Sequence, residues 1–268
     1  MDTPQIDIVR GGRLPGLQLR ADGDVDEGQA ADVGLGTMTG HFSVFGAWYE
    51  IHSWWEGDFL ERVAPGAFRD TFAAHWSDDD AHRIKVMYDH GLDYSIGDKL
   101  LGRVETLRED KTGAYYEVPL FDTSYNRDLA PGLEAGEYGA SFRFRVGEEH
   151  WVDDPGTSEH NPKGLPERTI LGTDTREFGP TPFGASPTAT AGMRSLTDAY
   201  YETLRVRSPG LFEEACRAAG REIPTGRAAA RSTAGGGPGD EPTPPVQLPA
   251  EVRHRDLLLR GVIPHEPR

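Results

Sequence analysis

The sequence predicts a β-rich α+β fold, in which an antiparallel barrel or sandwich has a few helices on its outside. Three observations lead to this prediction. Many short segments alternate apolar with polar residues, which is the period of a half-buried strand. Two such segments flank a turn that contains Gly113, as expected for a hairpin. Few segments have the composition of a helix, and no internal repeat is present.

The alternation is clearest at residues 141–146, where the sequence SFRFRV follows Gly139. In a strand this period places the apolar side chains on one face and Ser141, Arg143 and Arg145 on the other. A serine held rigidly beside cations suits nucleophilic chemistry, with Arg143 as a candidate donor to an oxyanion. The alternative is an edge strand with a solvated polar face.

Earlier in the chain, residues 39–45 alternate and predict a strand, and residues 67–75 predict a short helix after a Pro-Gly turn. Residues 83–90 predict the clearest core strand. Alternate positions up to His90 share one face there, and Gly91 ends the run.

The segments 101–107 and 114–121 predict the hairpin, since Gly113 can adopt the positive φ that its turn requires. A short helix capped by Thr123 or Ser124 is expected next.

The remaining elements follow the strand at 141–146. Short strands are expected at 149–152, 168–171 and 176–183, the last with prolines suited to an edge. Helical composition continues at 196–207 and 211–221, which a Ser-Pro-Gly sequence separates.

Composition along the chain predicts three regions. Residues 1–35 are rich in Gly and Asp and predict a mostly disordered, acidic leader. Residues 36–222 form the folded domain. Residues 223–268 predict a flexible tail rich in Pro, Gly and Ala, with a possible short terminal helix at 251–260.

Charge and cysteine content narrow the functional classes. The net charge of -16 argues against a general nucleic-acid binder, because phosphate contacts need clustered Lys and Arg. Cys216 is the single cysteine, so no disulfide forms within one chain and a reducing, intracellular setting is expected. No apolar run approaches the roughly 20 residues of a membrane span.

The candidate catalytic residues form a series of a histidine, a serine and a third group. A serine nucleophile needs a base, and the base needs a partner that fixes its tautomer. His90 is the candidate base for Ser141, because it follows an apolar strand. The candidates for the third group are Glu177, Asp174, His150 and His160.

A metal site offers a second interpretation of the same region. Its possible ligands are His82, Asp89, His90 and Asp93, although their spacing matches no zinc pattern. No phosphate-binding glycine motif and no G-x-S-x-G motif is present, which argues against nucleotide-binding folds and α/β-hydrolases.

Six short motifs occur in a recognisable order. They are GHFSVFG at 40–46, FLERVAPGAF at 59–68, VMYDHG at 86–91, LGRV at 101–104, GASFRF at 139–144 and REFG at 176–179. Over about residues 38–190 the chain resembles the prohead, or capsid maturation, serine proteases of tailed bacteriophages.

The resemblance implies a fold and a set of residue roles. The family is similar in fold to herpesvirus assemblin, which implies a closed or partly closed antiparallel β-barrel surrounded by helices. It implies His90 as general base, Ser141 as nucleophile and Glu177 as third member. Assemblin has a histidine as third member, so His150 and His160 stay open. The chain departs from the family at residues 179–187, where Pro-containing turns replace an apolar strand.

The implied function is that of a serine endopeptidase of capsid maturation that needs no cofactor. Its expected partners are the major capsid protein and a scaffolding protein or segment, which it cleaves along with itself. Self-association is expected, and a nucleic-acid or membrane partner is not. The expected location is the interior of the procapsid, in the host cytoplasm. The rival functions are a catalytically inactive scaffold protein and a metal-dependent hydrolase.

Overall fold

The computed structural model describes residues 6–12, 17–20, 35–78, 80–182 and 193–223. Strands outnumber helices in it, so the predicted β-rich α+β class is confirmed. The elements in chain order are β1 (Ile8–Gly12), β2 (Gln18–Arg20), β3 (Thr37–Val44), β4 (Tyr49–Ser53), β5 (Gly57–Val63), α1 (Arg69–His75), η1 (Asp80–His82), β6 (Lys85–Val86), η2 (Asp89–Gly91), β7 (Thr106–Glu109), β8 (Gly113–Pro119), α2 (Ser124–Glu134), β9 (Gly139–Val152), β10 (Glu167–Thr181), β11 (Met193–Ser195), α3 (Thr197–Arg207) and α4 (Pro209–Ala218).

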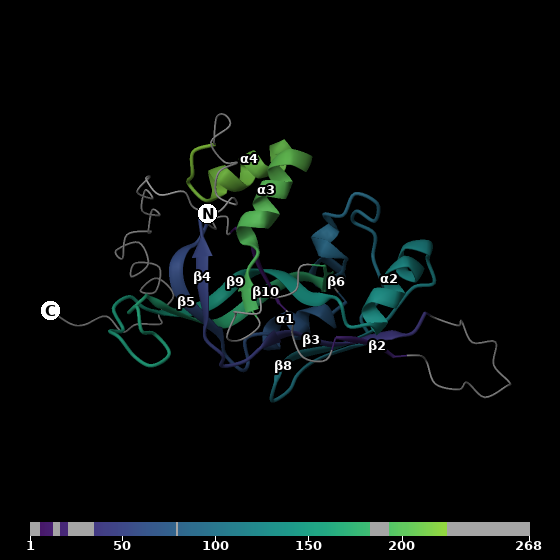
Figure 1. Cartoon of the computed structure of the whole chain (residues 1–268), viewed down its shortest axis with the longest axis horizontal. Helices are drawn as coiled ribbons and strands as arrows, with labels where there is room; N and C mark the ends of the chain where they lie inside the picture. The colour runs from purple at the N-terminus through teal and green to yellow at the C-terminus, as the bar shows by residue number, and fades with distance from the viewer. Residues whose placement is uncertain (1–5, 13–16, 21–34, 79, 183–192, 224–268) are drawn as a thin grey trace.

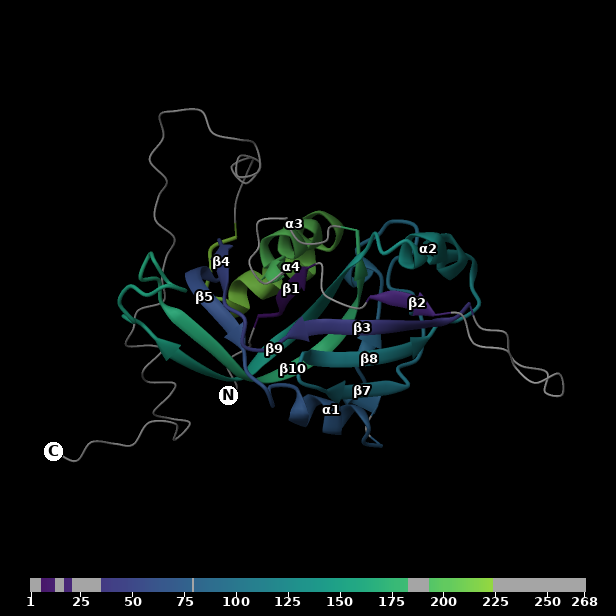
Figure 2. The ribbon, with the colours of Figure 1, turned by 60° about the horizontal axis from the view of Figure 1, so that its bottom comes forward.

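The strands form two sheets (Figure 1). The larger has the order β11-β1-β9-β10-β5-β4, with β6 also paired to β10, and the smaller has the order β2-β3-β8-β7. Most neighbours are antiparallel, but β5 and β6 both run parallel to β10. Figure 2 shows the long strands β9 and β10 running together through the middle of the molecule.

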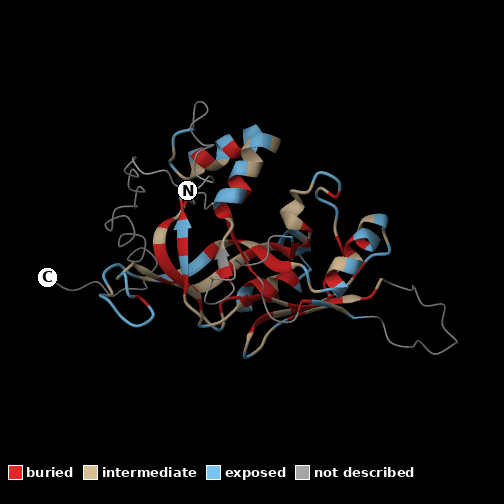
Figure 3. Cartoon of the chain, in the orientation of Figure 1, coloured by how far each residue is buried: buried red, intermediate tan, exposed pale blue. Residues whose placement is uncertain are grey.

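Aromatic side chains from both sheets meet in the main core, which Figure 3 shows as buried stretches of the strands. Phe42 of β3 has its ring centroid 4.8 Å from that of Phe178 on β10 and 5.3 Å from that of Phe142 on β9. Tyr116 of β8 lies 4.7 Å from Phe178. Burial of these rings holds one face of β9 and β10 against the smaller sheet.

Helices α3 and α4 cover the other face, near β1. Val9 of β1 packs in a second apolar cluster with Trp55 and Tyr201, whose ring centroids are 4.0 Å apart. Phe212 and Cys216 of α4 complete this cluster, and burial raises the pKa of the Cys216 thiol. Among the helices described, none has the length and apolar character needed to cross a membrane.

The predicted closed or partly closed antiparallel barrel is wrong, because neither sheet closes into a barrel within the described ranges. The larger sheet ends at β11 on one side and at β4 on the other. Side chains near these two ends are nevertheless in contact. Ser195 Oγ of β11 donates to Glu56 Oε1, in the turn after β4, at 3.2 Å, and Ser53 Oγ of β4 donates to Asp198 Oδ1, in α3, at 2.6 Å. The period of a strand predicts its buried face but not its neighbours, so closure does not follow from it.

The prediction of a mostly disordered leader at 1–35 is wrong for β1 and β2. All five residues of β1 are buried, and the strand lies between β9 and β11. The backbone N–H and C=O groups of β1 form hydrogen bonds with the strands on both sides. Local composition does not reveal this stabilisation. The acidic run at 22–27 and the tail from residue 224 lie outside the described residues.

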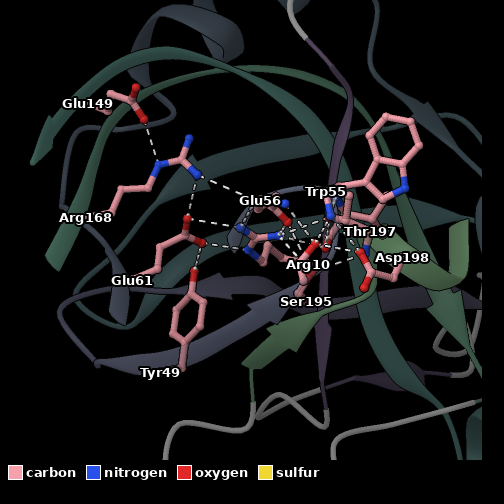
Figure 4. Close-up of polar contacts among 12 residues, drawn as sticks. Arg10, Tyr49, Trp55, Glu56, Glu61, Glu149, Arg168, Ser195, Thr197 and Asp198 are labelled. Carbon is pink, nitrogen blue, oxygen red and sulfur yellow. Dashed lines mark hydrogen bonds and ion pairs between the residues drawn. The ribbon is translucent and has the colours of Figure 1, made fainter. Parts of the chain in front are cut away.

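A buried network of charges fixes β1 to the rest of the sheet (Figure 4). Arg10 Nε donates to Glu61 Oε1 at 2.7 Å, and Arg10 Nη2 donates to Glu56 Oε2 at 2.6 Å. Glu61 also accepts from Arg168 Nη1 at 3.2 Å and from the Tyr49 hydroxyl at 2.7 Å. Burial acts to lower the pKa of Arg10, but the two glutamates outweigh it and raise that pKa well above its ordinary value.

Several other predicted elements are confirmed. The hairpin is β7 and β8, and the helix capped by Thr123 is α2, whose Asn126 N–H donates to the threonine hydroxyl at 3.4 Å. The helices expected at the end of the folded domain are α3 and α4. The strands predicted at 168–171 and 176–183 form one strand, β10. The strand predicted at 83–90 is confirmed only at β6, after which the chain turns.

Candidate active site

Ser141 lies near the start of β9, on the face opposite the aromatic core. Its register partners are Gly11 of β1 on one side and Gly179 of β10 on the other. Phe142 and Phe144 are fully buried in the core, which confirms the predicted alternation along this strand. Only 1% of Ser141 is exposed, so strands and helices cover the candidate nucleophile.

His90 lies in η2, a short turn that follows β6. Asp89, His90 and Gly91 have positive φ angles of 45°, 58° and 74°. This conformation is strained for the two non-glycine residues, and such strain concentrates at functional sites. The prediction that extended the core strand to His90 is therefore wrong at its end, because the turn redirects the chain just before the histidine.

Glycine at position 179 allows the segment that leads to His90 to pass close to β10. A Cβ on Gly179 would lie 1.8 Å from the carbonyl oxygen of Met87. The Met87 N–H donates to the carbonyl of Phe178 at 3.0 Å. The Pro-containing segment after Glu177, a departure from the family pattern, continues β10 as far as Thr181.

His90, Ser141 and Glu177 form one hydrogen-bonded series. His90 Nε2 lies 2.7 Å from Ser141 Oγ, and His90 Nδ1 lies 2.6 Å from Glu177 Oε1. A carboxylate only accepts hydrogen bonds, so Nδ1 carries the proton and Nε2 is left to accept from the serine. The histidine and glutamate side chains are 5% and 1% exposed, which strengthens their electrostatic interaction.

The hydroxyl of Ser141 has two acceptors within reach. The carbonyl oxygen of Arg10 lies 2.8 Å from Ser141 Oγ, about as close as His90 Nε2. A hydroxyl has one proton, so it donates to one of the two at a time. A Cβ on Gly11 would lie 2.8 Å from Ser141 Oγ, which shows how closely the backbone of β1 covers the serine.

The cover that β1 gives Ser141 predicts slow modification of a thiol at this position. With His90 replaced by alanine in both variants, so that no base activates the thiol, Ser141→Cys is expected to react with iodoacetamide at least about tenfold more slowly than Ser158→Cys, because reaction at position 141 requires local opening. Ser158 is an exposed matched control, and the parent chain measures the background from buried Cys216. Equal alkylation rates would show that β1 does not shield position 141.

Arg143 lies two residues beyond Ser141, and its guanidinium contacts two carboxylates. Nε donates to Glu177 Oε1 at 3.2 Å, and Nη1 donates to Asp7 Oδ2 at 2.8 Å. Burial acts to lower the pKa of Arg143, but attraction to Glu177, Tyr200 and Asp7 outweighs it and raises that pKa. These contacts give no support to the predicted role as an oxyanion donor.

The other candidates for the third group have different partners. His150 is exposed near the far end of β9. His160 Nε2 lies 2.8 Å from Glu167 Oε1, and Asp174 pairs with Arg176 at 2.6 Å. Within the described residues, the carboxylate that contacts the His90 imidazole is therefore that of Glu177 on β10.

The predicted metal ligands are His82, Asp89, His90 and Asp93. In the part of the chain that the structure describes, no three His, Cys, Asp or Glu side chains are grouped to hold a metal ion. Both ring nitrogens of His90 have hydrogen-bond partners in the series described above.

Sequence reasoning missed two residues that support the His90 turn, Thr181 and Arg207. Thr181 Oγ1 donates to Asp89 Oδ1 at 3.1 Å. Arg207, at the end of α3, donates from Nη1 to the Gly91 carbonyl at 3.4 Å. No local pattern marks these residues, because each acts on a segment at least 90 positions away in the chain.

A serine, a histidine and a carboxylate in one hydrogen-bonded series are the arrangement of a serine hydrolase. The family model described as caudovirus prohead serine protease matches residues 23–201, which include all three side chains. This match spans more than half of the chain, so the chain belongs to the caudovirus prohead serine protease family and is a serine protease of phage capsid maturation. Searches of curated proteins and of solved structures found no match to this chain.

Proposed function

We propose that the protein cleaves peptide bonds with Ser141 as nucleophile, His90 as general base and Glu177 as the group that orients His90. The observation that carries this proposal is the series of hydrogen bonds from Glu177 Oε1, through both ring nitrogens of His90, to Ser141 Oγ. Family membership supports it independently.

In the proposed reaction, Ser141 Oγ attacks the carbonyl carbon of the scissile peptide while His90 Nε2 takes its proton. The C–N bond breaks as His90 donates that proton to the leaving nitrogen, which leaves an ester on Ser141. A water molecule that His90 deprotonates hydrolyses the ester and restores the serine. The carboxylate of Glu177 stabilises the imidazolium that forms in both steps.

Access to the nucleophile requires a local movement. Gly11 lies directly beside Ser141, and the Arg10 carbonyl competes for the serine proton. A peptide therefore reaches Ser141 when β1 separates from β9 at this point. The same separation leaves His90 as the remaining acceptor for the hydroxyl.

The proposed substrates are a scaffolding protein or the scaffolding segment of the major capsid protein, and the protease itself. Membership of a prohead protease family supports this choice and a place of action inside the procapsid. The compartment that we propose is the host cytoplasm. We assign catalysis to residues 36–222 together with β1. The tail at 223–268 is proposed to serve as a separate, flexible segment.

Co-expression with the capsid and scaffolding proteins of the same phage tests this proposal. Mass measurement of every fragment is expected to show products with the parent chain and none with Ser141→Ala. Fragments of the protease itself would reveal self-cleavage. Intact capsid and scaffolding proteins beside the parent chain would favour an inactive scaffold protein instead.

Glu177→Gln is expected to slow cleavage by about 10²- to 10⁴-fold without abolishing it, since a third member usually matters less than the nucleophile. The acidic limb of the pH–rate profile should move to lower pH, because the imidazolium loses its anionic partner. Asp174→Asn is the matched control, since that carboxylate lies on the same strand but pairs with Arg176.

A different outcome would reassign the third member. The site is a Ser-His-His arrangement if Glu177→Gln cleaves at the parent rate with an unshifted pH–rate profile, while His150→Ala or His160→Ala loses most of its cleavage activity.

A further inference from the structure

A series of polar and charged side chains extends from Glu177 toward the segment before β1 and toward α3. Arg143 Nε donates to Glu177 Oε1 at 3.2 Å, and this is the oxygen that also accepts from His90 Nδ1. Arg143 Nη1 donates to Asp7 Oδ2 at 2.8 Å and to the Tyr200 hydroxyl at 3.3 Å. Arg143 therefore joins the candidate catalytic carboxylate to the segment before β1 and to α3.

The carboxylate of Glu177 depends on Arg143 for charge compensation. Its side chain is 1% exposed, and burying an ionised carboxylate is costly unless it is paired and hydrogen-bonded. The His90 ring, in its proposed role as general base, contributes one hydrogen bond to this carboxylate from Nδ1. Glu177 Oε2 is buried and has no hydrogen-bond partner within the described residues. Arg143 is the cation that contacts this carboxylate.

Two donors from different elements also fix the orientation of the carboxylate. His90 approaches Oε1 from the turn η2, and Arg143 approaches it from β9, where Arg143 is the register partner of Glu177. A carboxylate with one donor can rotate about its terminal bond, whereas two donors select one rotamer. Supporting hydrogen bonds of this kind hold catalytic groups within the narrow tolerance that reaction requires.

Asp7 holds the other end of the guanidinium. Its Oδ2 accepts from Arg143 Nη1 and its Oδ1 accepts from Arg145 Nε, both at 2.8 Å. Asp7 is 17% exposed, so its pairing with Arg143 is only partly screened by solvent. The residue lies in the region that sequence composition assigned to a disordered leader.

We propose that Arg143 is a positioning residue for Glu177, and that Asp7 holds Arg143 in place. The inference rests on the proposed function, because Arg143 acts on the reaction through Glu177. It replaces the oxyanion role predicted for Arg143 from its place on the strand. Loss of Arg143 lets the carboxylate turn away from His90 Nδ1. Ser141 and His90 are expected to stay in place, because β9 and the turn η2 position them.

A double-mutant cycle tests this inference. Arg143→Gln is expected to lower kcat about tenfold with KM within about twofold, since a positioning residue acts on the transition state. In the Glu177→Gln background the same substitution should cost less than about twofold, because the group on which it acts is already lost. An equal loss in both backgrounds, or no loss in either, would overturn the proposal.

Arg145→Gln is the matched control, because Arg145 contacts Asp7 but not Glu177. It should change kcat by less than about twofold. Asp7→Asn should reduce kcat in the parent and not in Glu177→Gln. Thermal unfolding checks that each variant is folded. If Arg143→Gln does not fold, Arg143→Lys takes its place in the cycle, since it keeps the charge but lacks Nε.

A spectroscopic readout separates this inference from the proposed function. The Nδ1 proton of His90 should give a low-field ¹H NMR resonance that His90→Ala removes. Arg143→Gln is expected to shift or broaden it, and Arg145→Gln to leave it unchanged. An unchanged resonance in Arg143→Gln would overturn the positioning role. If Ser141→Ala processes capsid protein normally, the proposed function fails, and the resonance still decides whether Arg143 holds Glu177.

Discussion

Ser141→Ala is expected to abolish proteolysis, with a loss on the order of 10⁴-fold or more. The substitution removes the oxygen that attacks the substrate and leaves only binding and electrostatic stabilisation. The fold should persist, since one hydroxyl is deleted from the face opposite the aromatic core. The measurement is the rate of capsid-protein cleavage during co-expression, with the melting temperature as a check on folding.

His90→Ala should reduce the cleavage rate as much as Ser141→Ala does. The double variant should be no slower than either single variant, because nucleophile and base act as a unit. Ser158→Ala is the matched control, since Ser158 is exposed in a loop away from this site, and it should cleave at the parent rate. Normal processing by Ser141→Ala would exclude Ser141 as the nucleophile.

Arg10→Met is expected to destabilise the protein by about 3–5 kcal/mol, the usual cost of removing one partner of a buried ion pair. Arg10 is fully buried between Glu56 and Glu61, which keep Arg168 as their remaining cation. Burial acts to raise the pKa of Glu56, but the contacts with Arg10 outweigh it and lower that pKa. The stability that this pair contributes is therefore present at neutral pH and is lost as the pH falls toward the lowered pKa. Urea unfolding measures the change.

Arg20→Met provides the comparison, because Arg20 also pairs with a glutamate, Glu117, but its side chain is 56% exposed. An exposed pair of this kind contributes less than about 1 kcal/mol. If both substitutions cost the same, the Arg10 network does not anchor β1 and its burial has no energetic consequence for the fold.

Local patterns predicted the residues of several elements correctly. The alternation at 141–146 placed Phe142 and Phe144 in the core and Ser141 on the opposite face, as the structure shows. The hairpin followed from Gly113, and the start of α2 followed from the capping threonine. Each of these depends on neighbours a few positions apart, which a single sequence displays directly.

Predictions failed where distant segments override local preference. Residues 8–12 have glycines and charge that predict disorder, yet they are buried because β9 and β11 pair with both edges of β1. The core strand that ends at β6 continues as a strained turn, since Met87 and Asp89 bind to β10. The larger sheet is open, and β5 and β6 run parallel to β10. Both features depend on which strands pair, and local patterns do not specify this.

The sequence by itself determined which residue types are present and which face of its strand Ser141 occupies. It also carried the six ordered motifs through which the family is recognised, because these are short and local. Only the tertiary structure decided that His90, 51 positions from Ser141 and 87 from Glu177, contacts both of them. It alone placed Arg143 in contact with Glu177, and Asp7 in contact with Arg143. Such contacts depend on strand pairing and packing across the whole domain, which no local period encodes.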